Sequence, residues 1–373
     1  MKGKRIILSV TNDLVTDQRV HRSCMALTEA GYEVTLVGRL LRDSKPLKRP
    51  YHTARMRLLF NKKAVFYAEY NLRLFLRLLF SRCDLYYAND TDTLLANYMA
   101  ARLRRKPLFF DSHELFPDMP ELVGRERVKH VWEWIERKIV PKTQGRCTVC
   151  QSIAEILQQR YGKEFKVVRN VPMRCDAKAA RHQPGEKYTL LYQGAVNVGR
   201  GIEEVLAAMP YLDDCEFVVA GIGDLFDELR QKSHDMGLDD RVRFLGRLPL
   251  EELSKVTLNA DLGLAILRHL GTSYYYALPN RISDFAQCGL PMLATDFPEP
   301  RRIIEQYRIG TLLPEGEEYD PRRLAQVIHE TLREWDSITE DDRRERFAKA
   351  GEELCWERDR EVLLKEVAVA FQR

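Results

Sequence analysis

Short apolar runs alternate with longer amphipathic segments along nearly the whole chain, and this alternation limits the fold more than any other feature. Short apolar runs bounded by turn residues are typical of buried strands, and a 3.6-residue apolar period is typical of helices. A helix is predicted from Asp17 to Ala30, closed by Gly31. Strand then helix, repeated many times, predicts an α/β fold with parallel sheets. In the first half, strands are predicted at residues 5–10, 33–37, 84–87, 108–111, 146–149 and 166–169.

The second half restarts the same alternation after a polar interval. That interval, residues 173–187, lacks apolar periodicity and contains Pro184 and Gly185, so it is predicted to be a linker. A chain of 373 residues is too long for one compact core. We therefore predict two Rossmann-like domains, at 1–173 and 187–356, with ligands bound where strands end. The second domain is predicted to contain strands at 188–193, 215–220, 242–245, 261–266 and 291–295 and helices at 202–209, 224–236, 249–257, 280–288 and 299–306.

Charge is distributed unevenly between the two predicted domains. Residues 1–173 contain 32 Lys and Arg against 18 Asp and Glu, and the remaining residues contain 27 against 37. A basic half indicates an anionic partner for the first domain. We expect no nucleic acid, because no recognition motif accompanies the basic residues. A phospholipid surface or a lipid-phosphate acceptor is the better expectation.

The sequence contains neither a signal-peptide core nor a run long enough to span a membrane. Met1 to Arg5 is followed by only five mostly apolar residues, Ile6 to Val10, which fit a first buried strand better. The most apolar candidate span, Leu72 to Phe80, is interrupted by Arg73 and Arg77. We expect a cytoplasmic protein that is peripheral on the inner face of the membrane if it docks there.

The eight cysteines are scattered among predicted strands and helices, which indicates reduced thiols in a reducing compartment. Cys147 and Cys150 have the spacing of half a zinc site. No second pair completes that site, so we interpret both cysteines as small buried residues.

Loops that follow predicted strands carry residues suited to binding a diphosphate. Strand 188–193 runs into a glycine-rich loop that contains Gly194, Arg200 and Gly201. Glycines let the backbone approach a ligand, and an arginine can grip a diphosphate through its planar set of donors. The alternative interpretation is an ordinary tight turn with a solvated arginine.

Two further strand ends and one helix start add to this candidate set. Arg281 and Asp284 lie three residues apart near the start of the predicted helix 280–288, and so share one face. The base could bind phosphate and the acid could accept hydrogen bonds from ribose hydroxyls, although a surface ion pair is the plainer alternative. The additional candidates for donor binding are Gly221, Gly223, Arg247, Leu248, Asn280, Arg281 and Asp284.

The order of these loops resembles the nucleotide-binding domain of glycosyltransferase family 4. In that family a basic residue and a glycine end the first loop, as Arg200 and Gly201 do here. The family's ribose-binding acid lies five positions before a glycine, as Asp284 precedes Gly289. Other similar segments are Asp17–Val20, Gly31–Val34, Asp111–Pro117, Val242–Gly246, Asn170–Pro172 and Trp356–Glu357.

This resemblance implies a GT-B fold, in which two Rossmann-like domains face each other across a cleft and the last helix, here 357–373, crosses back onto the first. It implies a retaining transfer of sugar from a nucleotide diphosphate sugar to a glycan or lipid-linked acceptor, in cell-surface polysaccharide or glycolipid biosynthesis. Arg200 and Arg281 would then stabilise the leaving diphosphate, and His113 would contact the reacting sugar. The reaction so implied requires no metal and no cofactor. The acceptor-side residues would be Asp17, Arg19, Asp90 and Glu114.

Two departures from the family pattern affect the expected donor contacts. Ala195 stands where the family usually has an arginine, and Tyr276 stands where it has an acid that contacts hydroxyls of the donor sugar. The stretch Gly271-Thr272-Ser273 is the candidate replacement for that acid. The missing acid leaves open a non-catalytic subunit that binds nucleotide sugars. A sugar-nucleotide 2-epimerase on the same architecture is a second alternative.

Two other motifs have more than one interpretation. Asp90-Thr91-Asp92 resembles the metal-binding Asp-x-Asp of a different transferase fold, but its place before an apolar helix favours helix capping or acceptor contact. The segment Arg55 to Arg82 mixes basic residues with leucines and phenylalanines. It could lie on an anionic leaflet, or it could be a domain helix with a solvated basic face.

Overall fold

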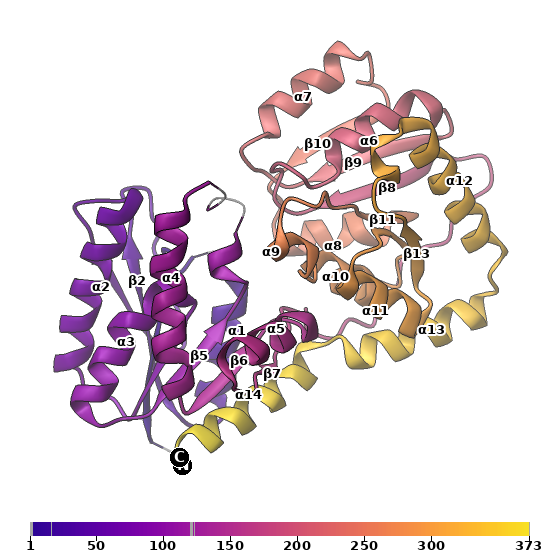
Figure 1. Cartoon of the computed structure of the whole chain (residues 1–373). Coiled ribbons are helices and arrows are strands. Elements are labelled where there is room, and N and C mark those ends of the chain that lie inside the picture. Colours follow the sequence, from indigo (N-terminus) through magenta and orange to yellow (C-terminus); the bar gives the residue numbers. More distant parts are fainter. Residues whose placement is uncertain (1–2, 16, 120–121, 123, 373) are drawn as a thin grey trace. The chain divides into compact units, whose positions relative to one another are not determined.

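The computed structural model describes residues 3–15, 17–119, 122 and 124–372, and divides the chain into two compact units (Figure 1). Unit 1 comprises residues 1–170 and 359–373, and unit 2 comprises residues 171–358. The expected boundaries, 1–173 with 357–373 and 187–356, differ from these mainly in where the second unit begins. Within the described ranges, no helix is both long and apolar enough to cross a membrane.

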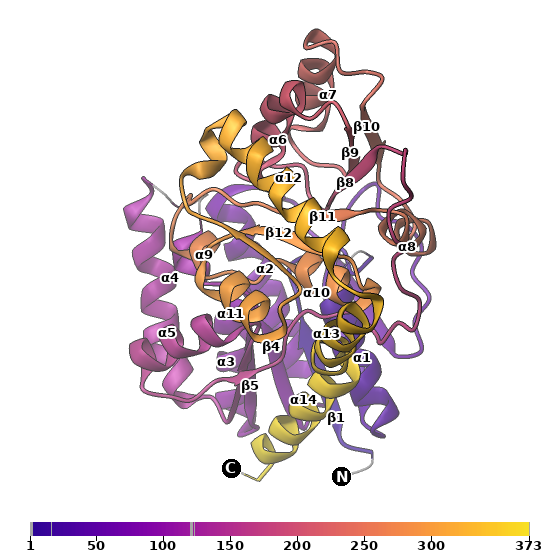
Figure 2. The same cartoon turned by 90° about the vertical axis from the view of Figure 1, so that its right-hand side faces the viewer.

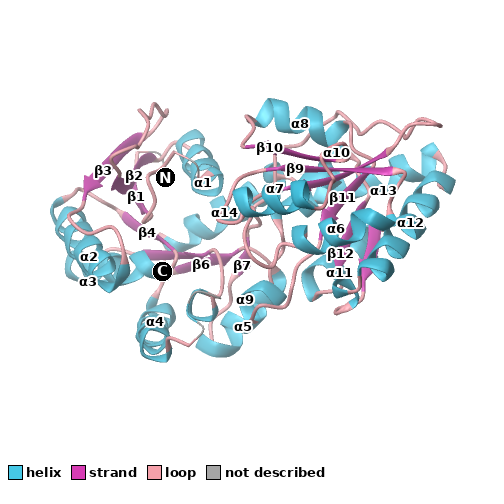
Figure 3. Ribbon diagram, turned by 90° about the horizontal axis from the view of Figure 1, so that it is seen from above, coloured by secondary structure: helices cyan, strands magenta, loops and turns pink. Residues whose placement is uncertain are grey.

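Unit 1 is built on a parallel sheet of seven strands in the order β3-β2-β1-β4-β5-β6-β7. Helices α2, α3 and α4 cover one face of this sheet, and α1 and α14 cover the other (Figure 3). Its strands are β1 (Arg5–Ser9), β2 (Glu33–Leu40), β3 (His52–Arg57), β4 (Leu85–Asn89), β5 (Leu108–Ser112), β6 (Gly145–Thr148) and β7 (Lys166–Val167). Its helices are α1 (Gln18–Glu29), α2 (Lys63–Phe80), α3 (Thr91–Arg104), α4 (Glu126–Ile139), α5 (Gln151–Tyr161) and most of α14 (Trp356–Ala370).

The last helix, α14, begins in unit 2 and packs on the sheet of unit 1. Its Asp359 is 3% exposed and forms an ion pair of 2.6 Å with Arg169, just after β7. Further along, Glu366 accepts a hydrogen bond from the backbone N–H of Arg146, and Phe371 stacks on Tyr32. These contacts make α14 an integral layer of unit 1.

Unit 2 is built on a parallel sheet of six strands in the order β10-β9-β8-β11-β12-β13. Helices α6 and α12 pack together over one face of the sheet (Figure 2). Its strands are β8 (Tyr188–Gln193), β9 (Cys215–Ala220), β10 (Val242–Gly246), β11 (Leu262–Ala265), β12 (Met292–Thr295) and β13 (Gly310–Leu313). Its helices are α6 (Ile202–Ala208), α7 (Phe226–Asp235), α8 (Leu250–Leu258), α9 (Thr272–Tyr275), α10 (Asn280–Cys288), α11 (Pro298–Tyr307), α12 (Pro321–Ser337) and α13 (Glu340–Glu353).

Alternate residues of the central strand β8 pack into two separate apolar cores. Leu190 and Tyr192 belong to the core beneath α6 and α12, whereas Leu191 belongs to the core beneath α10 and α11. This alternation is the two-residue period of a strand, and both faces are buried because helices cover both sides of the sheet. The fold is therefore two Rossmann-like parallel α/β units.

The polar interval at 173–187 is better described as part of unit 2 than as a linker. It contains no helix or strand, as predicted from its composition. However, the backbone N–H groups of Ala179 and Ala180 donate to the carbonyls of Cys288 and Leu258, at 2.6 and 3.0 Å. The interval is thus tied to α10 and α8, and unit 2 begins at Val171.

The basic segment 55–82 is not one helix. Its first residues complete β3, which pairs in parallel with β2, and only Lys63–Phe80 is helical. In α2, a buried stripe recurs every fourth residue at Phe66, Tyr70, Leu74 and Leu78. That spacing is the inward face of an amphipathic helix packed on its own domain.

Candidate functional site

The predicted donor-binding loops all follow the carboxyl ends of strands in unit 2. From β8 the chain proceeds outward through β9 to the edge strand β10, and then returns to β11 on the other side of β8. The point between β8 and β11 is therefore the topological switch point, where open parallel sheets bind ligands. Arg281 and Asp284, on α10, both contact residues of β8 at this point.

Arg281 is buried beside the end of β8. It is 6% exposed, and its guanidinium lies 4.2 Å from the ring centre of Tyr192. Its Nη2 donates to the hydroxyl of Tyr192 at 3.3 Å, and its Nη1 donates to the carbonyl of Leu264 at 3.5 Å. Burial, and next the charge of Arg200, lower the pKa of Arg281, while Tyr192 opposes both. Both hydrogen-bond acceptors named here are formally neutral, and the charge of nearby Asp284 offsets the burial of this guanidinium only in part, since its pKa stays lowered.

Arg200 supplies a second cation close to Arg281. Its guanidinium lies 4.6 Å from the ring centre of Tyr274, and its Nε is buried without a hydrogen-bond partner in the described part of the chain. Neither arginine forms an ion pair with a carboxylate among the described residues, in contrast to Arg268, which pairs with Glu204. Two neighbouring cations without counter-ions are an arrangement that an anion would stabilise.

The glycines of the first two loops have different physical roles. A β-carbon on Gly221 would lie 1.8 Å from the carbonyl oxygen of Gly194, and one on Gly223 would lie 2.3 Å from that of Val196. These two glycines are therefore required for the packing of one loop on the other. Gly194 has a φ of 133°, and a β-carbon there would meet only the ends of the Arg281 and Tyr192 side chains, both at 3.8 Å.

Gly201 stands at the N-terminal end of α6 with a φ of 79°. A β-carbon there would lie 2.6 Å from that of Ile266, which follows β11. This glycine thus brings the first loop against the strand on the other side of the switch point. The prediction treated it as a donor contact, and the structure adds that it is needed for packing.

Asp284 is held by a buried amide. Gln193 Nε2 donates to Asp284 Oδ2 at 2.9 Å, and Gln193 Oε1 accepts from the hydroxyl of Thr257 at 2.9 Å. Arg281 is buried and does not form the surface pair that we considered, although the charge of nearby Asp284 raises its pKa. Gln193, Tyr192 and Tyr274 complete the surroundings of the two arginines, and their residue types alone carry no signal for it.

The remaining predicted donor residues lie further from this cluster or on the surface. Arg247 is exposed and Leu248 is half-buried after β10, which is the edge strand. Asn280 is exposed as the first residue of α10. At the position of the missing acid, Tyr276 ends the short helix α9 and its ring packs edge-on against Tyr275. Ala195, which replaces the usual arginine, is exposed.

In unit 1, His113 lies just after β5 between two carboxylates. Its Nδ1 is 3.2 Å from Asp90 Oδ2 and its Nε2 is 3.4 Å from Asp111 Oδ2. Its backbone N–H also donates to Asp90 Oδ1 at 2.7 Å. Burial alone would lower the pKa of His113, but Asp90 and Asp111 outweigh it and raise that pKa to about 9. At neutral pH the imidazole is therefore a cation, and its Nε2, 3.4 Å from Asp111 Oδ2, has no hydrogen-bond partner among the described residues.

Asp90 does not cap α3 through its side chain, which corrects one interpretation of the Asp-Thr-Asp motif. It stands at the N-cap position without a side-chain cap bond, and its carboxylate bonds to His113 instead. Its φ of 58° and ψ of 167° are a strained conformation for a residue with a side chain. Burial, and then the charge of Asp90, raise the pKa of Asp92 to about 7, while the carboxyl accepts a hydrogen bond of 2.6 Å from Thr11.

The other residues predicted on the acceptor side have structural partners. Asp17 caps α1, because its carboxylate accepts the backbone N–H of Val20 at 3.0 Å. Arg19 is 4% exposed and pairs with Asp111 at 2.6 Å, so it holds that carboxylate in place. Glu114 is half-buried directly after His113, and its carbonyl accepts a hydrogen bond from Ser112.

The cysteines form no disulfide among the described residues. Cys147 and Cys150 are both buried, and all eight cysteines are free thiols. One group of three possible metal ligands lies close together, formed by Asp214, Cys215 and His329. It sits at the amino end of β9, at the opposite sheet edge from the arginine cluster, and Asp214 and His329 already pair at 2.8 Å.

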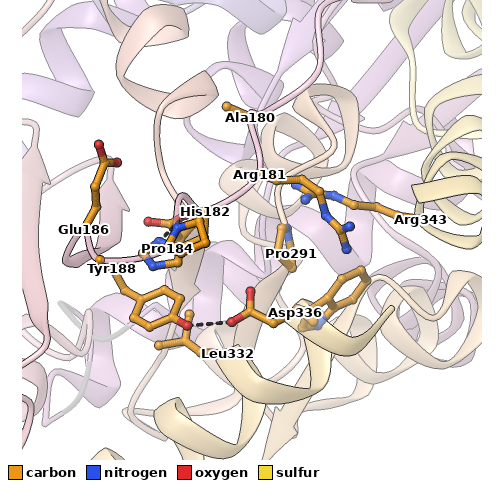
Figure 4. Close-up of a pocket in the computed structure, with 13 residues that line it drawn as sticks. Ala180, Arg181, His182, Pro184, Glu186, Tyr188, Pro291, Leu332, Asp336 and Arg343 are labelled. Atoms are coloured by element: carbon orange, nitrogen blue, oxygen red, sulfur yellow. Dashed lines mark hydrogen bonds and ion pairs between the residues drawn. The ribbon is translucent and has the colours of Figure 1, made fainter. Parts of the chain in front are cut away.

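A pocket of about 520 Å³ also lies at this amino-terminal edge, before β8, β11 and β12 (Figure 4). In it His182 stacks on Tyr188, with ring centres 3.7 Å apart, and the Tyr188 hydroxyl donates to Asp336 at 2.5 Å (Figure 4). None of the predicted site residues lines this pocket.

Two family profiles match the chain in succession. The profile described as Glycosyltransferase Family 4 matches residues 17–171, which belong to unit 1 except for the last one. The profile described as Glycosyl transferases group 1 matches residues 175–354, within unit 2. The two matches meet at the boundary between the units.

Individual relatives are distant. A phosphatidyl-myo-inositol mannosyltransferase from Mycobacterium leprae is 27% identical over 189 residues, which are 49% of this chain and 46% of that protein. The chain thus spans less than half the length of the curated relatives it matches.

Solved structures match over the whole chain. The sucrose-phosphate synthase of Thermosynechococcus elongatus superposes with a TM-score of 0.77 at 18% identity, covering 99% of both chains. HepE from Anabaena, solved with UDP-glucose, superposes with a TM-score of 0.71 at 14% identity, covering 98% of this chain and 99% of that one. These similarities show the fold. With the two profile matches, they establish that the chain belongs to the GT-B glycosyltransferases, with a family 4 region followed by a group 1 region.

Proposed function

We propose that this protein transfers a sugar from a nucleotide diphosphate sugar to a glycan or lipid-linked acceptor, with retention of configuration at the anomeric carbon. The observation that carries the proposal is the pair Arg200 and Arg281, two cations without carboxylate partners among the described residues. Their place at the β8–β11 switch point is where a parallel sheet binds a ligand. Family membership supplies the reaction class.

The chemistry requires stabilisation of negative charge on the leaving diphosphate. Preorganised cations in a partly dry site are the strongest means a protein has for this. In the proposal Arg200 and Arg281 serve this purpose, Asp284 accepts from the ribose, and cationic His113 donates to the reacting sugar. A phosphate oxygen of the donor takes the acceptor's proton, so that the residues proposed here complete the reaction without a metal.

Nucleotide binding by the purified protein tests the proposal. Calorimetric titration with UDP, GDP and ADP is expected to give binding by at least one of them. Arg200→Ala is expected to raise its Kd by about 10- to 100-fold, since a hydrogen bond to a charged group contributes about 1.5–3 kcal/mol. Arg230→Ala, at an exposed arginine on α7, is the matched control and should not change Kd. The absence of binding by all three diphosphates would refute the proposed site.

The stereochemical part has its own test. Nuclear magnetic resonance of the first product formed from a donor of known configuration is expected to show that configuration retained. An inverted product would exclude the retaining reaction while leaving the donor site intact. His113→Ala is expected to reduce turnover and to leave the Kd of the nucleotide diphosphate unchanged.

We also propose that unit 1 associates with an anionic membrane surface on the cytoplasmic side. The excess of basic residues in the first 173 residues supports this. Flotation with vesicles containing phosphatidylglycerol should recover the protein at low salt and lose it at 0.5 M salt, because surface charges are screened within about 10 Å at 0.1 M. Equal recovery with purely zwitterionic vesicles would contradict the electrostatic attachment.

A further inference from the structure

An apolar groove of unit 1 is lined by residues of helices α2, α3 and α4. These helices stand side by side, with α3 packed against both neighbours (Figures 1 and 3). The groove has a volume of about 970 Å³. Its walls are mainly aliphatic and aromatic, and include Tyr67, Leu72, Phe75, Met99, Val131 and Trp132.

Large apolar side chains also stand exposed on the three helices that line this groove, and Leu72 and Val131 among them belong to the lining itself. On α2, Leu72 is 61% exposed, and on α4, Trp134 is 57% exposed. Leu76, Phe80, Leu103 and Val131 are exposed as well, on the same three helices. Large apolar side chains gathered in this way on neighbouring helices mark a surface that buries something apolar.

Basic residues accompany the apolar surface. Arg125 and Arg127 line the groove at the start of α4, and Arg73 and Arg77 are exposed on α2. Counted over residues 62–82, 91–106 and 125–142, these helices and their flanks hold 15 Lys and Arg against 5 Asp and Glu. Two of those five acids, Asp92 and Glu136, are buried. The surface therefore complements a ligand that has an apolar body and an anionic end.

The segment that follows His113 contributes to the wall of the groove. Phe116 and Met119, three and six residues beyond His113, are among its lining residues. Asn71, also in the lining, donates to the carbonyl of Asp92 and accepts from the backbone N–H of Ala96. One wall of the groove is thus tied to the start of α3, directly after Asp90, and another is formed by the segment directly after His113.

We propose that this groove binds the hydrocarbon chain of a membrane lipid with an anionic head group, and that this lipid is the acceptor. The proposal rests on the proposed function, because it names the class of acceptor for that reaction. The hydrocarbon lies between α2, α3 and α4. Arg125 and Arg127 hold the anionic group at the rim.

Decyl phosphate, below its critical micelle concentration, is a suitable soluble probe for calorimetric titration of the full chain. It is expected to bind, and each methylene removed from the alkyl chain is expected to weaken binding roughly fourfold, from about 0.8 kcal/mol per buried CH₂. Glycerol phosphate, which offers the head group alone, should show no binding. Arg127→Gln should weaken binding of decyl phosphate without changing its dependence on chain length.

Ala68→Trp fills the groove from an exposed position on α2, and should weaken decyl phosphate binding at least tenfold. Ala348→Trp, at an exposed alanine in the middle of α13, is the matched control and should bind as the unmodified protein does. Unchanged binding by Ala68→Trp, or binding independent of chain length, would refute the groove as the site. A dimer that Ala68→Trp dissociates, without any binding of decyl phosphate, would refute it in favour of self-association.

The proposal for the groove and the proposal for the donor site can be refuted independently of each other. Decyl phosphate binding involves no nucleotide, and UDP, GDP and ADP binding should be unaffected by Ala68→Trp. If the unmodified protein bound decyl phosphate but none of the three nucleotides, the proposed function alone would be refuted. Decyl phosphate binding that is insensitive to Ala68→Trp, in a protein that still binds nucleotide, would refute the groove alone.

Discussion

Among single residues, His113 carries the clearest electrostatic signature in unit 1. It is a cation because Asp90 and Asp111 flank it, and Asp111 is itself ionised because Arg19 holds it. Burial opposes this ionisation, but Arg19 and His113 together keep the pKa of Asp111 well below its usual range. The four side chains form an alternating series of charges at the ends of β4 and β5.

Stability of unit 1 should therefore depend on pH through His113. Its pKa is raised from 6.5 to about 9. Its contribution to the free energy of unfolding is therefore fully present below pH 6.5 and is lost as the pH rises through about 9. The shift corresponds to on the order of 3 kcal/mol. Urea unfolding at pH 6 and pH 9.5 should show this loss in the unmodified protein. His113→Gln should flatten the difference, and His130→Gln, on the exposed side of α4, should retain it.

The backbone of Asp90 offers a second test at this scale. Asp90→Gly and Asp90→Ala both remove the carboxylate that faces His113, but only glycine adopts a φ of 58° with a ψ of 167° without strain. The glycine variant is expected to be about 1–3 kcal/mol more stable to unfolding than the alanine variant. Equal stability of the two variants would show that this backbone conformation is not strained.

At the scale of elements, α14 packs on unit 1 through contacts that contribute unequally to the free energy of unfolding. The pair Arg169–Asp359 is nearly buried, whereas the pair Glu29–Arg360 has its carboxylate 48% exposed. Breaking a buried pair by removing one partner leaves an uncompensated charge, and exposed pairs contribute little. Asp359 on α14 and Glu29 on α1 thus form a matched comparison of two contacts made by neighbouring residues of α14.

Asp359→Asn should destabilise the protein by about 3–5 kcal/mol, and Glu29→Gln by about 1 kcal/mol or less. Urea unfolding followed by circular dichroism measures both. Similar losses in the two variants would contradict the assignment of α14 as a buried layer of unit 1. Proteolysis of the C-terminal residues should also be faster in Asp359→Asn alone.

The sequence predicted helices and strands whose apolar periodicity is strong, but it did not predict contacts that depend on tertiary packing. The strands at 188–193 and 215–220 and the helix at 280–288 were predicted with their observed bounds, because apolar runs and end glycines mark them. The helices α12 and α13 were not predicted, although the buried residues Leu324, Ile328 and Trp335 give α12 a helical apolar period. Gln193 holds Asp284 through contacts from α8 and α10 that only the tertiary structure brings together.

At the scale of the whole molecule, the two units should respond differently to nucleotide. Hydrogen exchange is expected to slow in peptides covering residues 194–201 and 280–284 when a binding nucleotide diphosphate is added, since ligands stabilise the segments they contact. Peptides from α2, α3 and α4 should exchange unchanged. Protection confined to unit 1 would contradict the assignment of the donor site to unit 2.

The path of the chain through the two units has a consequence for biosynthesis. Unit 1 is interrupted after Asn170 and resumes at Asp359, with all of unit 2 in between. At about 5–20 residues per second, a ribosome needs roughly 10–40 s to make the intervening segment. During that time the surface later covered by Leu363 and Val367 of α14 stays open to water. Unit 2 can therefore fold first, whereas unit 1, most of which is synthesised earlier, is completed last.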